Sequence, residues 1–463
     1  MNGIIAVVIC NYNKKEYVKK NIESLQRQTM KLFDVFVVDN ASTDGSADEI
    51  EKTFKREIKV IRNTCNLGGS GGFNTGIREA MKYDYQYIVL LDNDVVLKED
   101  ALKVLYDDMR DNEDIGILGA KIMKMDYPDI IQEFAPTINF STLNFELNHG
   151  GEEDKGRLPH IVDCDYVPAC ALMVRREVVE KIGCMPDENF IYYDDIEWGI
   201  RCKRAGYRVA ADSLATVWHK GGALVNPTTF ATYYLNRNKI YFFMRYMMLN
   251  KPAAVSRLSQ EERIDAILRD IYEGIYSCEY RGVYNVAKTR MDALLDAING
   301  MCGKAEPYKI RHREIIDEKF DMAIMNARSV RIYMNGLWEC TRRILYHIKS
   351  LESKYERKIK IELTDNITHD QGELLGEPIY SDEHSKDEDF DLVFHVCKHI
   401  YEIEIMSLNN KWVDGWRNTI FDANDFESYR AFHHGYEVFK LCMADCLKEA
   451  MNRIAGDYSY VEM

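Results

Sequence analysis

The sequence has few of the features that mark several large classes of protein. It has no excess of basic residues, since 60 Lys and Arg face 75 Asp and Glu and leave a formal net charge of −15. A chain of this charge repels phosphate backbones, so nucleic acid is not an expected partner. Only 9 residues are proline, and 46% are hydrophobic, which excludes a fibrous or wholly disordered chain and indicates a folded globular protein.

Disulfide motifs and long apolar runs are also missing. The 12 cysteines include no Cys-x-x-Cys pair, and several lie in apolar stretches. They are expected to be reduced and buried rather than to form a disulfide framework. No apolar run approaches the roughly 18 to 20 residues of a transmembrane helix. The short run Ile4–Cys10 lacks the pattern of a secretion signal, so the sequence predicts a cytoplasmic protein.

The first half of the chain alternates short β-branched runs with amphipathic stretches. Strands are predicted at Ile4–Cys10, Val35–Asp39, Lys59–Arg62 and Tyr87–Leu91, and helices at Lys14–Gln28, Ser46–Lys55 and Gly72–Met81. This order predicts an α/β fold with a mostly parallel sheet flanked by helices. Ligands bind beyond the carboxyl ends of the strands in such sheets, so the polar residues that end each strand are candidates for function.

Long helical patterns replace this alternation after about residue 228. The predicted organisation is therefore one domain over residues 1–228 and a mainly α-helical region over residues 229–463, with an acidic loop at about 368–391. The helical stretch Tyr233–Leu249 mixes basic and aromatic side chains. It has two open interpretations, contact with a membrane surface or packing against the first domain.

Two carboxylates follow the fourth predicted strand, in the sequence LLDNDVVL. Asp92 and Asp94 suit a hard divalent cation that keeps positions open for phosphate oxygens, although an isolated Asp-x-Asp is more often a turn. His219 ends an apolar stretch in VWHKGG. A single histidine is usually structural, but this one offers a nitrogen ligand that would complete a carboxylate-bound Mn²⁺ site.

A glycine-rich segment, NTCNLGGSGGFNTG, precedes the helix before that strand. Four glycines within Gly68–Gly72 would let the backbone approach a ligand closely. The free N–H groups of the next helix would face an anionic diphosphate or sugar hydroxyls. The spacing matches neither a P-loop nor a dinucleotide-binding fingerprint, and a flexible connector is the alternative.

An acid pair, Asp194 and Asp195, stands at the start of another predicted helix. Acids in a first helical turn commonly serve as caps. Aromatic residues surround the pair, and they suit either a platform for stacking on sugars or core packing. These aromatic residues are Phe190, Tyr192, Tyr193 and Trp198.

In this order, the motifs resemble the inverting family 2 glycosyltransferases of GT-A fold. The matching features are VVICNYN, VVDNASTDGS, the Asp-x-Asp and the run from Phe190 to His219, and the likeness covers about Ile4 to Arg245. More narrowly, NLGGSGGFNTG, FIYYDDIEWGIR, VWHKGG and YYLNRN are similar to bacterial galactofuranosyltransferases and rhamnosyltransferases.

The resemblance implies a role for each matching position. In the catalytic pair Asp194 and Asp195, the second acid would be the general base, and Asp92, Asp94 and His219 would hold Mn²⁺ or Mg²⁺. Acceptor-binding residues would be Tyr192, Tyr193 and Trp198. Residues implied to bind a nucleoside-diphosphate sugar donor are Asn11, Asp39, Asn66, Gly71, Gly72, Asn74, Asp92 and Asn93. The galactofuranosyltransferases often have a third Asp where this chain has Asn93, a change that lowers the negative charge of the site.

The function implied is metal-dependent, inverting transfer of a hexosyl unit, with galactofuranose favoured, in bacterial cell-surface polysaccharide synthesis. The acceptor would be a glycan or a lipid-linked glycan, which allows peripheral contact with the inner face of the plasma membrane. A homo-oligomer is a further expected arrangement. The alternatives are transfer of rhamnose or another hexose from a dTDP- or UDP-sugar, and a catalytically silent GT-A scaffold of a glycan-synthesis complex.

Overall fold

The chain, seen in a computed structural model, divides into two compact units. One comprises Met1–Ile267, Lys288–His312 and Asp445–Met463, and the other Leu268–Ala287 and Arg313–Ala444. The described residues are 3–55, 58–140, 143–221, 227–249, 259–280, 282–314, 319–367, 369, 371–381, 386–398, 410–415, 418–421 and 425–457. The first unit continues beyond residue 228, and the domain boundary expected there stays a prediction.

The first unit is built on a ten-stranded sheet. The strands lie in the order β10 (Ile161–Asp163), β12 (Arg208–His219), β6 (Ile115–Lys124), β11 (Ala171–Arg175), β4 (Tyr87–Asp92), β1 (Ile5–Asn11), β2 (Phe33–Asp39) and β3 (Ile58–Arg62). β5 (Val95–Leu97) pairs with β12, and β7 (Tyr127–Glu133) pairs with β6. The four strands predicted from the sequence, β1 to β4, are parallel neighbours, whereas β11 runs antiparallel to β4 and β6. The predicted α/β class is confirmed.

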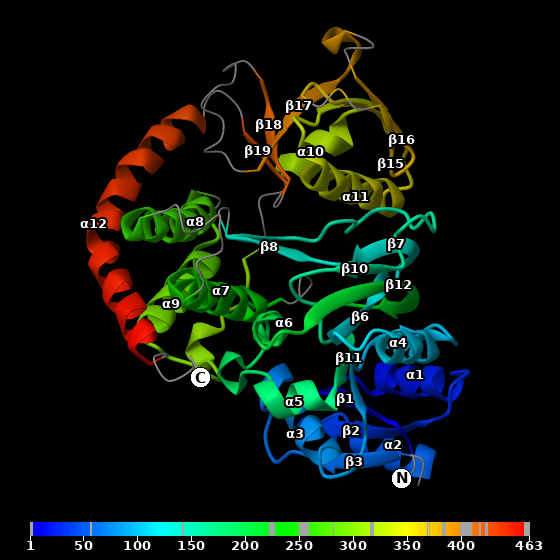
Figure 1. The fold of residues 1–463 in the computed structure, drawn as a ribbon. Helices are drawn as coiled ribbons and strands as arrows, with labels where there is room; N and C mark the ends of the chain where they lie inside the picture. Colours follow the sequence, from blue (N-terminus) through cyan, green and yellow to red (C-terminus); the bar gives the residue numbers. More distant parts are fainter. Residues whose placement is uncertain are drawn as a thin grey trace. The chain divides into compact units, whose positions relative to one another are not determined.

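Helices cover both faces of this sheet (Figure 1). Those packed on one face are α1 (Lys15–Gln26), α2 (Ser46–Phe54) and α4 (Ala101–Asp111), and those on the other are α3 (Gly68–Ala80), α5 (Arg176–Ile182) and α6 (Asp194–Arg204). β1 shows why: Ile5 and Val7 point into one core, Ala6 and Val8 into the other, and all four are fully buried. Alternation of side chains along a strand supplies both cores from one apolar run.

The helix at the glycine-rich segment begins four residues earlier than the predicted start at Gly72. α3 begins at Gly68, so the glycines form its first turns. A side chain at Gly72 would overlap the sulfur of Cys10, and one at Gly76 would overlap Val8. Their physical role in the structure is therefore to let α3 lie close against β1.

Several further elements lie in the first unit or have residues in both units. A two-stranded sheet is formed by β8 (Thr137–Asn139) and β9 (Asn144–Glu146), and a short 3₁₀ helix, η2 (Asp187–Asn189), precedes α6. The long helices are α7 (Phe230–Leu249), α8 (Gln260–Tyr280), α9 (Tyr284–Ile298) and α12 (Phe426–Asp457). None of the helices among the described residues has the length and apolar character needed to cross a membrane.

α7 packs within the first unit, one of the two interpretations of its sequence. Tyr233, Phe242 and Phe243 are each no more than 2% exposed. The ring of Phe242 lies 5.7 Å from that of Tyr193, and Phe243 lies 6.3 Å from Phe145 of β9. Burial of these rings accounts for the aromatic character of the helix, and membrane contact stays a prediction.

The second unit contains a seven-stranded sheet that the sequence did not predict. Its strands lie in the order β15 (Gly372–Leu374), β16 (Glu377–Tyr380), β14 (Lys360–Thr364), β13 (Ser329–Tyr333), β17 (Leu392–Cys397), β18 (Trp412–Asp414) and β19 (Thr419–Phe421). α10 (Lys319–Asn326) and α11 (Trp338–Lys354) pack against it. The expectation of a mainly helical C-terminal region holds, but this sheet accompanies the helices.

Part of the predicted acidic loop is a β-hairpin. β15 and β16 pair antiparallel across Leu375 and Gly376, whose φ angles of 53° and 81° suit a two-residue turn with both central residues left-handed. β15 is an edge strand, and most of its residues are exposed. An edge strand needs little apolar sequence, which explains why its composition resembles that of a loop.

Candidate active site

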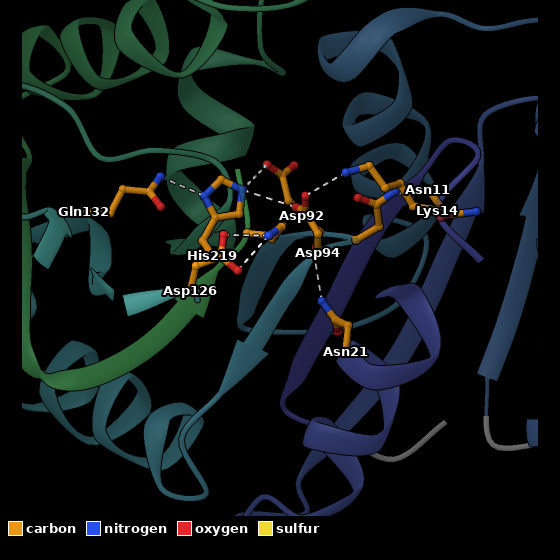
Figure 2. A network of polar contacts seen from close by, with 10 residues as sticks. Asn11, Lys14, Asn21, Asp92, Asp94, Asp126, Gln132 and His219 are labelled. Carbon is orange, nitrogen blue, oxygen red and sulfur yellow. Dashed lines mark hydrogen bonds and ion pairs between the residues drawn. The ribbon is translucent and has the colours of Figure 1, made fainter. Parts of the chain in front are cut away.

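Two carboxylates and an imidazole meet at the carboxyl end of β4. Asp92 is the last residue of β4, Asp94 lies in the turn that follows, and His219 ends β12. Nε2 of His219 is 3.2 Å from Oδ1 of Asp94 and 3.7 Å from Oδ2 of Asp92 (Figure 2). One ligand atom from each residue lies within 4.8 Å of the other two. The structure thus brings together the three residues expected to hold a metal.

Strand pairing explains this meeting of distant residues. β5 follows Asp94 directly and runs antiparallel to the end of β12, so that Val95 is opposite His219. The side-chain amide of Asn21, on α1, donates a hydrogen bond of 2.8 Å to the carbonyl of Asp92. The turn that carries both carboxylates is therefore fixed from two sides.

Gln132 supports the imidazole from its other side. The side-chain nitrogen Nε2 of Gln132 lies 2.9 Å from Nδ1 of His219 (Figure 2). An imidazole that is protonated, or that offers Nε2 to a metal, carries a hydrogen on Nδ1, and the amide of Gln132 accepts that hydrogen when it is turned so that its oxygen takes the place of Nε2. Gln132 belongs to β7, whose place beside β6 only the folded sheet reveals. No sequence motif marks it.

The electrostatics of the cluster favour a cation. Burial raises the pKa of Asp92 to about 6, although the charge of His219 opposes this. Burial also acts to raise the pKa of Asp94, but the hydrogen bond from His219 and the charges of His219 and Lys14 lower it to about 2. Nζ of Lys14 lies 3.0 Å from Oδ2 of Asp94, an ion pair that the sequence did not predict.

The same residues suit a divalent metal ion. Burial acts to lower the pKa of His219, but its hydrogen bond to Asp94 and the charges of Asp92 and Asp94 raise it. Two carboxylates and one imidazole form a mixed oxygen and nitrogen donor set, which Mn²⁺ accepts more readily than Mg²⁺. Two carboxylates held this close together gain from a bound cation, so the residues present fit the expected metal.

Three of the residues expected to bind the donor form one polar network. Asn11 is fully buried at the end of β1, where it pairs in register with Asp39 of β2. Its amide donates to the hydroxyl of Ser46 at 2.8 Å and lies 3.5 Å from Oδ1 of Asp39. Its carbonyl oxygen accepts a 3.0 Å hydrogen bond from Asn93. Asn93 lies between Asp92 and Asp94, which together with His219 are called the metal cluster below. Ser46 is a member of the polar network that the sequence did not indicate.

The residues at the start of α3 mostly hold the protein itself together. Oδ1 of Asn66 accepts hydrogen bonds from the N–H of Gly68, at 2.8 Å, and from Asn40, at 3.1 Å. Gly71 and Gly72 allow close packing within the helix turn and against β1. Donor-binding roles for Asn66, Gly71 and Gly72 stay predictions.

Asn74 lies apart from the metal cluster and from the network of Asn11. It is fully buried, and its amide donates to the carbonyl of Met185 at 2.7 Å and also to Asp187. Its carbonyl oxygen accepts the N–H of Met185 at 3.1 Å. These bonds use the side chain to hold the segment that leads toward the acid pair, so they give no support to a donor-binding role.

The acid pair is tied to the metal cluster through the main chain. Asp194 and Asp195 open α6, and Oδ2 of Asp195 accepts the N–H of Ala169 at 3.0 Å. The carbonyl of the next residue, Cys170, accepts the N–H of Asp92 at 3.1 Å. Two consecutive residues, Ala169 and Cys170, therefore connect Asp195 to Asp92 through main-chain hydrogen bonds.

Burial gives the acids of this site pKa values near neutrality. It raises the pKa of Asp194 to about 7, with a further contribution from the charge of Asp195. It raises the pKa of Asp195 to about 6, against the hydrogen bond from Ala169. Burial also raises the pKa of Glu133 to about 7, although the hydroxyl of Tyr166 donates a 3.2 Å hydrogen bond to it. A carboxylate of this kind is a suitable general base near pH 7.

Two of the three residues expected to contact an acceptor are core residues. Trp198 is fully buried, and its Nε1 donates a 2.9 Å hydrogen bond to the carbonyl of Gly183. Tyr193 is 5% exposed, with its ring 5.3 Å from that of Phe145. Rings without exposed faces cannot stack on a sugar, so core packing replaces this expectation for both. Tyr192 is partly exposed, and its role stays a prediction.

The segment before the acid pair has an unusual backbone. Phe190, Tyr192 and Tyr193 have φ angles of 65°, 64° and 69°. Bulky residues rarely adopt these values, and such strain persists only where surrounding contacts hold it. The acid pair thus begins its helix from a backbone that needs external support.

α7 provides this support from the motif YYLNRN. The amide of Asn238 lies 2.9, 2.8 and 3.0 Å from the carbonyl oxygens of Asn189, Ile191 and Tyr192. Arg237 donates a 3.0 Å hydrogen bond to the carbonyl of Asn189. Both side chains are buried, and together they hold the strained segment in place. The sequence marked this motif only by its resemblance to other proteins.

A comparison with protein-family models matches the part of the chain that carries Asn11, Asp39, Asp92 and Asp94, whereas Asp195 and His219 lie beyond the match. The family model described as "Glycosyl transferase family 2" matches residues 6–183. The galactofuranosyltransferase GlfT2 of Mycolicibacterium smegmatis is 29% identical over 175 residues, which are 34% of this chain and 27% of that protein. The dTDP-rhamnosyl transferase RfbF of Shigella flexneri is 28% identical over 213 residues, 45% of this chain and 66% of RfbF. The chain therefore spans about a quarter of GlfT2, and the match to the family model ends at residue 183.

Binding of Mn²⁺ is the direct test of the metal cluster. In calorimetric titration of the full chain, Asp94→Asn is expected to abolish binding at this site, because it removes a ligand oxygen. Gln132→Ala should weaken binding about 10- to 100-fold, since it removes only the group that orients His219.

Asp126→Asn is the matched control for charge. Asp126 pairs with Lys220, at 2.6 Å, and belongs to the surroundings of the cluster rather than to its ligands (Figure 2). Binding should be unchanged in this variant. Equal losses in Asp94→Asn and Asp126→Asn would show that diffuse negative charge, and not a defined ligand set, attracts the ion.

Proposed function

Because residues 6–183 match the model of glycosyl transferase family 2, we propose that this protein transfers a hexosyl unit from a nucleoside-diphosphate sugar to a glycan or lipid-linked glycan. The observation that carries the proposal is the link between Asp195 and Asp92 through Ala169 and Cys170. It connects a partly buried carboxylate that can act as a base with a carboxylate-rich site that can bind a cation, the two groups that a direct displacement at a sugar carbon requires.

The metal cluster serves the leaving group in this proposal. Asp92, Asp94 and His219 would hold a divalent cation, which supplies Lewis-acid stabilisation of the negative charge on the departing diphosphate. Lys14 adds a positive charge at the same edge of the sheet, and its side chain is 37% exposed. An exposed lysine can exchange its ion pair with Asp94 for a phosphate oxygen. The network of Asn11, Asp39 and Asn93 would receive the nucleoside.

Asp195 serves the acceptor. As the bond to the diphosphate breaks, the sugar becomes oxocarbenium-like, and an acceptor hydroxyl attacks the opposite face. Asp195 would take the proton of that hydroxyl, with Asp194 beside it as the second member of the pair. Base catalysis of this kind typically contributes about 10²- to 10⁴-fold to the rate. A single displacement with one base inverts the configuration of the anomeric carbon.

The proposal also specifies the donor sugar, which is galactofuranose. It is supported by the motifs shared with galactofuranosyltransferases and by the similarity to GlfT2, and the role would be in bacterial cell-surface polysaccharide synthesis. Rhamnosyl transfer is the alternative, supported by the similarity to RfbF. A catalytically silent scaffold is the remaining alternative, and transfer activity of the purified protein would exclude it. Membrane contact and oligomerisation stay predictions.

Nucleotide release with Mn²⁺ tests both donor and chemistry. Purified wild-type protein is expected to release UDP from UDP-galactofuranose in the presence of a glycan acceptor, and to release less dTDP from dTDP-rhamnose. Asp195→Asn should still bind Mn²⁺ and keep its melting temperature but lose transfer, because the isosteric amide cannot accept the proton. A larger rate with dTDP-rhamnose would overturn the galactofuranosyl choice, and full activity of Asp195→Asn would overturn the assignment of the base.

The pH profile gives a second test of the base. Burial favours the neutral form of Asp195, so the carboxyl takes up its proton near pH 6 rather than near the value of about 4 for an exposed Asp. We expect kcat/KM of the free enzyme to fall as the pH is lowered through about 6. The profile should be measured from pH 5 to 8 with saturating Mn²⁺ and at constant ionic strength. An acid limb with its midpoint below pH 5 would contradict a buried Asp195 as the base.

Asn238 provides a test of positioning. Asn238→Ala removes the hydrogen bonds to the strained segment, and misplacement of Asp195 is expected to lower kcat about 10- to 100-fold with little change in the donor KM. Leu235→Ala is the control on the same helix, because Leu235 is 38% exposed. Urea unfolding of both variants separates loss of fold from misplacement. An unchanged kcat in folded Asn238→Ala would show that the segment before Asp194 keeps its conformation without the hydrogen bonds from Asn238.

A further inference from the structure

A second cluster of two aspartates and one histidine lies in the first unit. Its members are Asp108 on α4, His160 just before β10, and Asp212 on β12. Nε2 of His160 is 2.9 Å from Oδ2 of Asp108 and 3.8 Å from Oδ1 of Asp212. One ligand atom from each lies within 4.8 Å of the other two, as in the cluster at the end of β4. The two clusters share no residue.

Regular secondary structure holds these residues in place. Ile161 is paired with Asp212 across β10 and β12, and the carbonyl of His160 accepts a 2.9 Å hydrogen bond from the N–H of Ser213. β12 has a register shift between Asp212 and Thr216, where it bulges away from β6. The imidazole and one carboxylate are thus fixed to the sheet, while α4 brings the other carboxylate.

Asp212 contributes to this cluster a buried carboxylate with one oxygen unpaired among the described residues. Its side chain is fully buried, and Oδ1 accepts the N–H groups of Leu214 and Ala215 at 2.8 and 3.2 Å. Within the part of the chain that the structure describes, Oδ2 has no hydrogen-bond partner. A buried carboxylate oxygen without a partner is costly, and the second carboxylate beside it increases that cost. A cation between the two carboxylates removes both penalties.

We propose that Asp108, His160 and Asp212 bind a divalent transition-metal ion of the Zn²⁺ type, which joins α4, β10 and the bulge of β12. Two carboxylate oxygens and one imidazole nitrogen are three protein ligands of the kind that Zn²⁺ accepts. His160 is 48% exposed, so an ion can enter from solvent and a water can complete four-coordinate geometry. The role is structural, and it is independent of the transfer reaction.

Counting bound zinc in matched variants tests the site. The full chain is dialysed against ZnCl₂, and bound metal per chain is measured by mass spectrometry. His160→Ala is expected to retain one Zn²⁺ fewer than the wild type. The double variant Asp94→Asn/His219→Ala should also retain one fewer, and the two losses should add when all three changes are combined.

His149→Ala is the control for removal of an exposed histidine. His149 lies 2.9 Å from Glu152 and is 41% exposed, but no second carboxylate accompanies this pair in a ligand cluster among the described residues. Zinc content should equal that of the wild type. A zinc content of His160→Ala equal to that of His149→Ala would overturn the proposal.

Thermal unfolding gives a second readout, which does not require counting the bound metal. In the Asp94→Asn/His219→Ala background, Zn²⁺ should raise the melting temperature, and it should fail to do so once His160→Ala or Asp108→Asn is added. His160 is exposed, so its replacement leaves the fold intact. A melting temperature that responds to pH but not to Zn²⁺ would mean that a shared proton joins Asp108 and Asp212, which would overturn the metal site.

Discussion

Burial of negative charge at the carboxyl end of β4 is the constraint on which the site depends. Asp92 and Asp94 emerge close together from the sheet, and the side chain of Asp94 is only 8% exposed, so the pair needs compensating positive charge. His219 provides it through the pairing of β5 with β12, and Lys14 provides it from the start of α1. A catalytic cation fits this arrangement because it would take over the same compensation and leave Lys14 free for a phosphate.

The acid pair depends on a different kind of support. Asp195 accepts a hydrogen bond from the main chain beside β4, while the strained segment that precedes it is held by Asn238 and Arg237 of α7. α7 therefore belongs functionally with the sheet, although its sequence follows the segment that matches the family model. The aromatic rings around the pair contribute packing, since Trp198 and Tyr193 are buried. The core of the first unit, rather than a surface loop, therefore positions the proposed base.

β12 links the two clusters of aspartate and histidine. Asp212 lies at its bulge and His219 at its end, and both positions depend on how this strand pairs with its neighbours. A shift of β12 by one residue would turn both side chains to the opposite face of the sheet. The register of a single strand thus determines whether either cluster can exist.

The amino-acid sequence by itself determined the parallel strands β1 to β4, their alternating helices and the polar residues at the strand ends, because these depend on local periodicity and on apolar runs. The order of its motifs also indicated Asp92, Asp94, Asp195 and His219 as candidate site residues. Tertiary structure decided what no local pattern encodes. Strand pairing placed Gln132 and Glu133 beside the site, and close helix packing, rather than ligand binding, accounts for Gly72. Burial removed Trp198 from the acceptor platform, and edge strands of polar composition concealed part of the second sheet. Contacts between residues distant in sequence depend on which strands become neighbours, and that choice is made by the whole core at once.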